Sequence, residues 1–414
     1  MTTARPQSDG PIGPPERMTA DALLPWRAEF PILEHTVYMV SHSLGAMPRG
    51  VYAELRAFAD AWADRGVRAW GEGWWELPIT VGNMVGRIVN APMGSVAMVQ
   101  NVTIGVEAIA SSYDWTGRRN RIVTTDVEFP SVLYLLVGLT RRGARLVRVP
   151  SADGLSFDTD QLLEAIDEET QLVVVSHVLF KSAAIVDIEP IVRRARQVGA
   201  HVLLDAYQSV GTVPCDVTLL DVDYMTGGSV KWLCGGPGAG FVYAKPSLIP
   251  TLKPSFCGWQ AHETPFTFDP GPMNYRNDAG RFLNGTPHVP CLYAAAAGYR
   301  IINEIGVNAI RARSLQLSQR LFDRADAAGF TINSPREAAR RGATVSLGVP
   351  EAHAVAKTLI AREFVVDFRP GAGIRIGPHF YNTEDEVDAV VAEIQSILKS
   401  GAWKEYQPPV GEVG

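Results

Sequence analysis

The chain has 414 residues, of which 46% are hydrophobic and 20% are charged, a composition typical of a folded globular protein and unlike that of a disordered or fibrous one. Its 38 Lys and Arg against 44 Asp and Glu give a net charge of −6, which argues against a nucleic-acid-binding surface. No stretch has the roughly 18 uncharged apolar residues of a membrane span, and the N-terminus lacks the apolar core of a signal peptide, so we expect a cytoplasmic protein without a membrane partner.

The spacing of the cysteines and the composition of the N-terminus give two further expectations. The four cysteines (Cys215, Cys234, Cys257 and Cys291) are far apart and lack Cys/His spacing, so we expect neither disulfides nor a metal site. Residues 1–22 contain four prolines and few large apolar side chains, which predicts a flexible leader outside the fold.

The middle of the chain alternates short apolar runs with helical patterns. After a helix over residues 51–70, we predict strands at 96–100, 121–125, 171–176, 201–205 and 240–244. Helices are predicted between them at 104–112, 131–140, 161–166 and 188–198. Such alternation indicates βαβ units and a mostly parallel sheet with helices on both faces, the α/β class.

The pattern changes after about residue 290. Two long helices are predicted at 292–305 and 309–328, followed by a strand at 344–347, a helix at 353–362, a strand at 365–368 and a final helix at 384–399. We therefore expect a large sheet domain over residues 23–290, which includes the N-terminal segment, and a smaller C-terminal α+β domain over 291–414.

The ends of the predicted strands carry the informative polar residues. Ligands of open parallel sheets bind beyond the carboxyl ends of the strands, and Asp205 ends an apolar strand. Lys231 is the only charged residue or histidine between Asp223 and Lys245, in a glycine-rich apolar segment. Desolvation there would favour the neutral amine, which Schiff-base chemistry needs.

This Asp and Lys spacing resembles the pyridoxal 5′-phosphate (PLP) site of fold-type I enzymes, in particular aminotransferase class V and its kynureninase-like branch. The resemblance covers about residues 28–395 and rests on VYMVSHSLGAMP, VEFPSVLYL, VSHVLFKS, LLDAYQSVG and GGSVKWLCGGPGAG, with a weaker match at FRPGAGIRIGPHFYNT. Together these motifs are specific for the family, whereas any one alone is not.

The resemblance implies a role for each matching residue. Lys231 would form the Schiff base and move protons at Cα, Asp205 would hold the pyridine nitrogen protonated, and Gln208 would bind the phenolic oxygen. Phe129 would stack on the ring, while Thr103, at a helix start, and Ser229 would bind the phosphate. Arg375 would bind the substrate α-carboxylate.

The remaining roles concern partners and substrate choice. Trp259 and Thr286 resemble residues that reach the phosphate of a neighbouring subunit, which implies a homodimer with shared sites. His42 replaces the family's usual asparagine and is a candidate for substrate binding, as is the aromatic group of Trp70, Trp74 and Trp75.

Several of these residues also have a plain structural interpretation. Phe129 could be a core aromatic, Thr103 a first-turn residue beneath an Asn101 cap, and Asp205 a helix cap. Arg375 lies between Ile374 and Ile376, an alternation that equally describes an exposed strand arginine. The tryptophans could serve packing alone, and the GGPGAG string is a weak phosphate-loop match because it lacks the GK[ST] ending.

Departures from the family pattern bear on the reaction. No cysteine lies between Phe364 and Thr383, where desulfurases of the family carry their nucleophile. Val230, Gln208 and Val132 occupy places where kynureninases usually have tyrosine, histidine and aspartate. The resemblance thus implies an enzyme that forms an external aldimine and a quinonoid with an L-α-amino acid and cleaves at Cβ, breaking either a C–C or a C–S bond.

Two other interpretations stay open. The same Schiff base could lead to transamination, epimerisation or decarboxylating deamination. Alternatively, a parallel sheet of this kind could belong to a non-catalytic nucleotide-binding protein, which would lack the near-visible chromophore.

Overall fold

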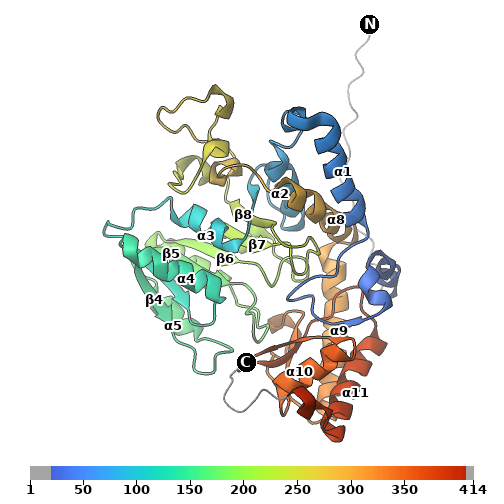
Figure 1. Ribbon diagram of the computed structural model, residues 1–414. Helices are drawn as coiled ribbons and strands as arrows, with labels where there is room; N and C mark the ends of the chain where they lie inside the picture. The colour runs from blue at the N-terminus through green and yellow to red at the C-terminus, as the bar shows by residue number, and fades with distance from the viewer. Residues whose placement is uncertain (1–19, 407–414) are drawn as a thin grey trace.

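The computed structural model describes residues 20–406, and the expected leader at 1–22 lies almost entirely outside them. A seven-stranded sheet forms the centre of the molecule, in the order β2-β8-β7-β6-β5-β3-β4 (Figure 1). Only β8 runs against its neighbours β2 and β7, so the predicted mostly parallel α/β sheet is confirmed. The strands are β2 (Val96–Val99), β3 (Arg121–Thr125), β4 (Arg145–Val149), β5 (Thr170–Ser176), β6 (His201–Asp205), β7 (Tyr224–Gly228) and β8 (Gly240–Ala244).

Helices cover both faces of this sheet because successive strand residues point to opposite sides. In β5, Val173 and Val175 belong to one apolar cluster, while Leu172 and Val174 belong to the other. The first cluster also contains residues of α2 (Leu77–Ile88), α5 (Thr159–Ala165), α6 (Glu189–Val198), α7 (Val217–Leu220) and α8 (Val289–Ile305). The second contains residues of α3 (Val102–Ala110) and α4 (Pro130–Leu139). Double burial explains why these strands are almost entirely apolar.

The direction of the strands decides where polar side chains collect. Strands β2, β3, β5, β6 and β7 are mutually parallel, so their carboxyl ends meet at one edge of the sheet. The segments that leave this edge lead to Thr103, Phe129, Ser176, Asp205 and Lys231. One edge therefore gathers residues that are more than a hundred positions apart in the sequence.

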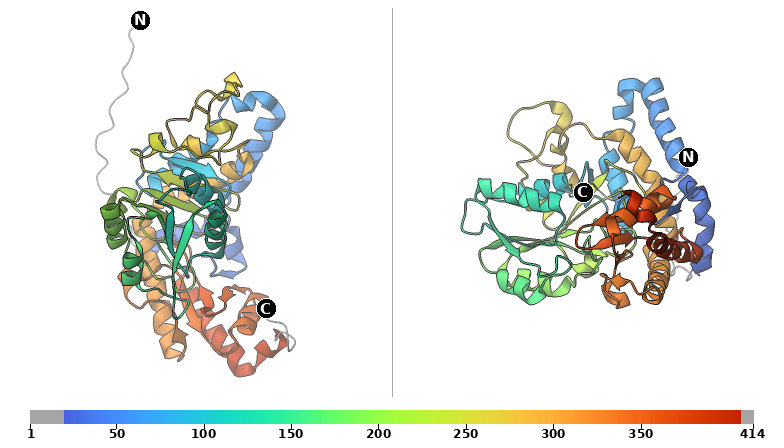
Figure 2. Two further views of the ribbon diagram at one scale, coloured as in Figure 1. Left: turned by 90° about the vertical axis from the view of Figure 1, so that its left-hand side faces the viewer. Right: turned by 60° about the horizontal axis from the view of Figure 1, so that its bottom comes forward.

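The C-terminal part forms a second, smaller layer, which lies below the sheet in Figure 1 and is seen from other sides in Figure 2. Its antiparallel sheet has the order β12-β13-β10-β9. The strands are β9 (Thr331–Ile332), β10 (Val345–Gly348), β12 (Asp367–Arg369) and β13 (Gly373–Ile376), and the helices are α9 (Val307–Ala327), α10 (Ala352–Ala361) and α11 (Glu384–Ser400). The short strand β1 (Val37–Tyr38) pairs with β11 (Phe364–Val365) and joins the N-terminal segment to this part.

The predicted elements match the observed ones to within a few residues, with informative exceptions. The helix predicted over residues 51–70 is α1 (Gly50–Arg65) followed by a 3-10 turn (Gly66–Trp70). The strand predicted at 365–368 is divided between β11 and β12. The sequence analysis did not predict α2, which has Pro78 in its first turn. It also did not predict β4, an edge strand in which exposed arginines interrupt the apolar run. Helix α8 packs on α1 and α2, and it shares the large core cluster with α2. The domain boundary near residue 290 stays a prediction.

None of the helices in residues 20–406 combines the length and the apolar character that a membrane crossing requires.

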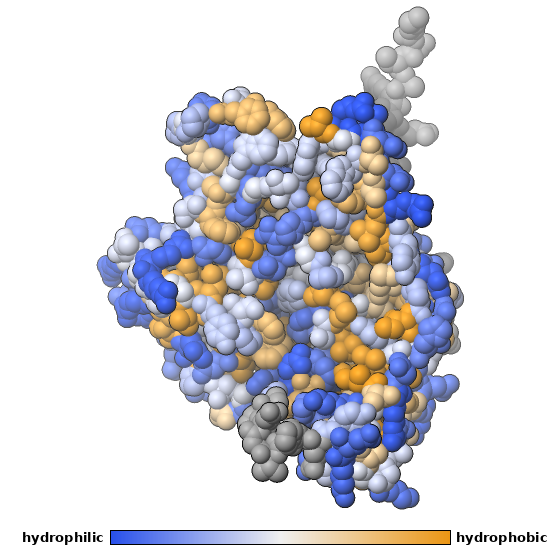
Figure 3. Space-filling view, in the orientation of Figure 1, coloured by the Kyte–Doolittle hydropathy of each residue, from blue (hydrophilic) through white to orange (hydrophobic). Residues whose placement is uncertain are grey.

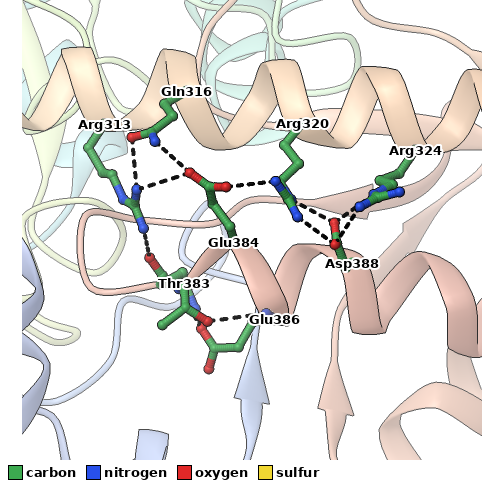
Figure 4. A network of polar contacts seen from close by, with 9 residues as sticks. Arg313, Gln316, Arg320, Arg324, Thr383, Glu384, Glu386 and Asp388 are labelled. Carbon is green, nitrogen blue, oxygen red and sulfur yellow. Dashed lines mark hydrogen bonds and ion pairs between the residues drawn. The ribbon is translucent and has the colours of Figure 1, made fainter. Parts of the chain in front are cut away.

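Charged side chains join α9 to α11 (Figure 4). Asp388 of α11 accepts paired hydrogen bonds from Arg320 at 2.7 and 2.6 Å and from Arg324 at 2.8 and 2.7 Å. Helix α11 begins at a capping box, in which Thr383 and Glu386 bind each other's backbone N–H groups. These contacts fix the register between the two helices.

We expect Asp388→Asn to lower the free energy of unfolding by about 1 kcal/mol, because two bidentate contacts at a partly exposed position are weakened together. The loss should shrink in 1 M salt, where charges at the surface are screened. Urea denaturation at low and high salt measures both effects, with Asp60→Asn on the exposed face of α1 as the control. An equal loss at both salt concentrations would contradict the electrostatic explanation.

Candidate active site

A cavity of about 610 Å³ lies at the sheet edge where the parallel strands end. Its walls come from the large sheet, from the N-terminal segment and from β12 and β13. The lining residues are His42, Ser43, Asn101, Val102, Thr103, Ile104, Phe129, Ser131, Ser176, Val178, Phe180, Asp205, Tyr207, Gln208, Val230, Lys231, Arg369 and Arg375.

Lys231 and Asp205 both face this cavity. The Lys231 Nζ lies over the rings of Tyr207 and Phe129, 4.4 and 5.7 Å from their centroids. One Asp205 oxygen accepts a hydrogen bond from the Tyr207 backbone N–H at 2.8 Å. Within residues 20–406 the other Asp205 oxygen has no hydrogen-bond partner, so it is free to bind a group inside the cavity.

Burial changes the protonation of both groups in opposite directions. It lowers the pKa of Lys231, although the Asp205 charge and a second carboxylate oppose this shift, and the charges of Arg375 and Arg369 lower the pKa further. Burial likewise raises the pKa of Asp205, against a hydrogen bond from Tyr207 and the charge of Lys231. Desolvation outweighs the attraction between the two charges, so a neutral Lys231 amine is accessible near neutral pH.

The first turn of α3 opens onto the same cavity. Asn101 caps the helix by accepting a hydrogen bond from the Ile104 N–H at 3.1 Å, and Thr103 lies in the first turn. The early N–H groups of a helix lack intrahelical partners and carry partial positive charge, which suits an anion such as phosphate.

Phe129 and Gln208 both line the cavity. Phe129 precedes α4, 40% exposed at the cavity wall, so the interpretation as a buried core aromatic is wrong. The Gln208 side chain donates to the His42 carbonyl oxygen at 3.1 Å and accepts from the Trp232 Nε1 at 3.3 Å. These bonds fix the amide beside Lys231.

Arg375 is buried, so the interpretation as an exposed strand arginine is also wrong. It lies on β13 directly opposite Asp367 of β12 and donates to both carboxylate oxygens of Asp367, at 2.8 and 2.5 Å. The His42 Nε2 lies 3.0 Å from the same carboxylate. Burial and the Arg375 charge lower the pKa of His42 to about 4, so its ring is neutral near pH 7.

Three predicted residues lie outside the cavity. Ser229 is buried, and its hydroxyl contacts the Ala239 carbonyl oxygen and the Tyr299 hydroxyl. Thr286 is exposed and borders a separate small hollow with Asn284 and His288. Trp259 is 41% exposed and packs against Trp75.

Apolar side chains surround Trp259 at the surface. Phe266 and Phe268 pack against it with ring centroids at 5.6 and 5.5 Å, and both are exposed. Figure 3 shows apolar side chains at this upper end of the viewed face. Trp70 and Trp74 pack with Phe58 in another cluster and do not line the cavity.

Helix α8 holds the loop that carries Lys231. A methyl group added at Gly298 would lie 2.3 Å from the Leu233 carbonyl oxygen, so the helix backbone and the loop are in direct contact. The loop returns through left-handed positions at Cys234, Gly236 and Gly238 before it enters β8.

The sequence analysis missed Asp367, Arg369, Glu128 and Ser176. Asp367 and Arg369 are the two charged residues of the sequence DFR. Their place at the site depends on the pairing of β12 with β13, which the spacing of residues in the sequence does not reveal. The signal for Glu128 was a carboxylate directly before Phe129. Glu128 is buried and accepts hydrogen bonds from Thr125 at 2.8 Å and from Ser176.

Glu128 has no cationic partner among residues 20–406. Burial raises its pKa from an ordinary 4.5 to about 7, against the hydrogen bonds from Ser176 and Thr125, and the nearby Asp205 charge raises it further. The folded protein therefore binds this proton more tightly than the unfolded chain does.

The stability that comes from protonated Glu128 should be fully present below pH 4.5 and should be lost as the pH rises through about 7. The thermal midpoint of the wild type should accordingly fall relative to that of Glu128→Gln across this interval and then remain level. Calorimetry at several pH values measures the difference, with Glu164→Gln on the exposed side of α5 as the control. A difference that does not change with pH would show that Glu128 keeps an ordinary pKa.

Comparison with known proteins identifies the class to which this fold and site belong. The family model for aminotransferase class-V matches residues 79–390, so the chain belongs to that family. Its members use PLP, and the cavity fits this cofactor: an amine for the aldehyde, an unpartnered carboxylate oxygen for the ring nitrogen, and a helix N-terminus for the phosphate. The chain is thus a PLP-dependent enzyme.

Within this family the chain is similar to kynureninases. It is 30% identical to the kynureninase of Pseudomonas fluorescens over 94% of this chain and 95% of that protein. It is 28% identical to the kynureninase of Bacillus cereus (strain ZK / E33L) over 94% of each.

Solved structures with the same fold include other activities. The apo cysteine desulfurase from Thermococcus onnurineus NA1 has a TM-score of 0.80 at 22% identity, covering 91% of this chain and 98% of that one. The cystine C-S lyase C-DES has a TM-score of 0.79 at 20% identity, covering 88% and 99%. These likenesses confirm fold type I and carry no information about the substrate.

Proposed function

We propose that the protein is a PLP-dependent lyase or hydrolase that cleaves a bond at Cβ of an L-α-amino acid. The observation that carries the proposal is that Lys231 and the free Asp205 oxygen line the same cavity. Kynureninases are relatives along almost the whole chain, which supports cleavage at this carbon.

Five of the residues that line the cavity would then bind the cofactor. PLP supplies an electron-withdrawing ring that stabilises negative charge at Cα when it is bound. We propose that Lys231 holds the cofactor and moves the Cα proton, that Asp205 binds the ring nitrogen, and that Gln208 binds the phenolic oxygen. Phe129 would cover the ring face and the start of α3 with Thr103 would bind the phosphate.

The substrate would be held from the C-terminal side of the cavity. Arg375 would bind the α-carboxylate, since a guanidinium matches two carboxylate oxygens. His42 would shape the pocket as a neutral ring, since its Nε2 is committed to Asp367.

The remaining predicted roles belong to assembly. We propose a cytoplasmic homodimer in which Trp259 and Thr286 approach the phosphate of the partner subunit's cofactor, because both lie away from the cavity of their own chain. Ser229 would then support the Lys231 loop through its contacts with Ala239 and Tyr299 and would not bind phosphate directly.

The bond that breaks is either C–C, with water as the second reactant, or C–S, by β-elimination. None of the four cysteines lines the cavity, which argues against a cysteine nucleophile. Val230 lines the cavity where kynureninases usually have tyrosine, so kynurenine itself need not be the substrate. Transamination, epimerisation and decarboxylating deamination are the alternative outcomes of the same cofactor, and a non-catalytic nucleotide-binding role is excluded by membership of the family.

Product analysis separates these outcomes. PLP-loaded enzyme should release alanine from L-kynurenine-type substrates or pyruvate, ammonia and a thiol from thioether amino acids. A keto acid that retains the side chain, an aldehyde or a D-amino acid from the same panel would overturn Cβ cleavage.

Substituting Lys231→Ala should abolish the covalent attachment of the cofactor to the chain and lower kcat by at least about a thousandfold, since both the covalent anchor and the proton carrier are lost. Borohydride reduction followed by denaturation and mass spectrometry of the chain measures the first effect, because only a cofactor bonded to the protein leaves its mass on it. Lys357→Ala, an exposed position on α10, is the matched control and should behave like the wild type. A cofactor that stays on the Lys231→Ala chain after reduction and denaturation, at the wild-type occupancy, would contradict the assignment.

A further inference from the structure

The hydrogen bonds of Arg375 leave a specific part of its guanidinium available. A guanidinium carries five N–H donors. The Nε and one Nη2 donor bind Asp367, and one Nη1 donor binds the Phe180 carbonyl oxygen at 2.5 Å. Among residues 20–406, one N–H on each terminal nitrogen therefore has no hydrogen-bond partner, and the side chain lines the cavity.

Asp367 is held by three neighbouring side chains. Its Oδ1 receives the His42 Nε2 at 3.0 Å and the Arg375 Nε at 2.8 Å. Its Oδ2 receives the Arg375 Nη2 at 2.5 Å and forms an ion pair with the Arg369 Nη2 at 3.1 Å. Three hydrogen bonds and one further ion pair thus fix the position of this carboxylate.

These partners hold Asp367 ionised. Burial alone would raise the pKa of Asp367, but the hydrogen bonds from His42 and Arg375 and the charge of Arg375 lower it well below its usual range. Gly377 is required for this arrangement, because a methyl group there would lie 2.2 Å from the His42 Nδ1. His42 is therefore pressed against the end of β13 and cannot turn away from Asp367 easily.

We propose that Asp367 is a positioning residue that presents two N–H donors of Arg375, one on each terminal nitrogen, to the substrate α-carboxylate. This inference rests on the proposed role of Arg375. Two donors in a fixed plane bind a carboxylate in one orientation, which in turn fixes the direction of the bonds at Cα. Asp367 thus helps to decide which bond lies in line with the cofactor.

The opposite possibility is that Asp367 competes with the substrate for Arg375. In that case the ion pair would have to open before a carboxylate could bind, and removing the charge of Asp367 would strengthen binding. The two possibilities predict changes of opposite sign, so a single variant distinguishes them.

The test uses PLP-loaded enzyme and two small probes, L-alanine and ethylamine, which differ in the carboxylate. Binding is followed through the near-visible band of the cofactor, with no turnover required. In Asp367→Asn we expect the affinity for L-alanine to fall at least tenfold and the affinity for ethylamine to stay within twofold. Asp367→Glu, which keeps the charge, should recover part of the loss, and Asp160→Asn on the surface of α5 should change neither value.

Tighter binding of L-alanine by Asp367→Asn, or an equal loss for both probes, would overturn the inference. A partial effect of the same sign in Asp367→Glu would support it even if Asp367→Asn folds poorly. The proposed function fails separately, if wild-type enzyme loaded with PLP retains no cofactor on the chain after borohydride reduction and denaturation.

Discussion

The structure depends on the cost of burying charge at the carboxyl ends of a parallel sheet. Lys231 and Asp205 share a cavity in which burial shifts the pKa of each toward its neutral form. Such a pair is expensive to leave without further partners, because its mutual attraction does not repay the lost hydration. A cofactor with one electrophilic carbon and one basic ring nitrogen would stabilise both groups, and the fold holds them facing the same cavity.

Much of this arrangement could be predicted from the sequence because it depends on local patterns. Apolar runs such as that of β5 mark doubly buried strands, and parallel strands necessarily bring their ends together, so Asp205 and Lys231 could be assigned to one edge without coordinates. The helix start at Thr103 and the turn at Phe129 follow from the same logic.

The parts that escaped prediction depend on contacts across the fold. Asp367 contacts its cross-strand partner Arg375 and also His42, which is more than three hundred residues earlier in the chain. Neither contact can be inferred from the sequence around Asp367. In the sequence Glu128 resembles an ordinary polar turn residue. In the fold it is buried and hydrogen-bonded to Thr125 of β3 and Ser176 of β5. Strand β4 was missed because an edge strand keeps charged side chains on its solvent side.

The same fold accommodates desulfurase and C–S lyase activities in other proteins, whereas this chain keeps its cysteines away from the cavity. The fold alone therefore does not determine which reaction a protein of this architecture catalyses.

The close contact between Gly298 and the Leu233 carbonyl oxygen has a consequence for how this enzyme can evolve. The backbone two and three residues after Lys231 is packed directly against helix α8, with no space at Gly298 for even one extra carbon. New specificities should therefore arise around an immobile lysine, and libraries that vary the α8 face would yield mostly inactive clones.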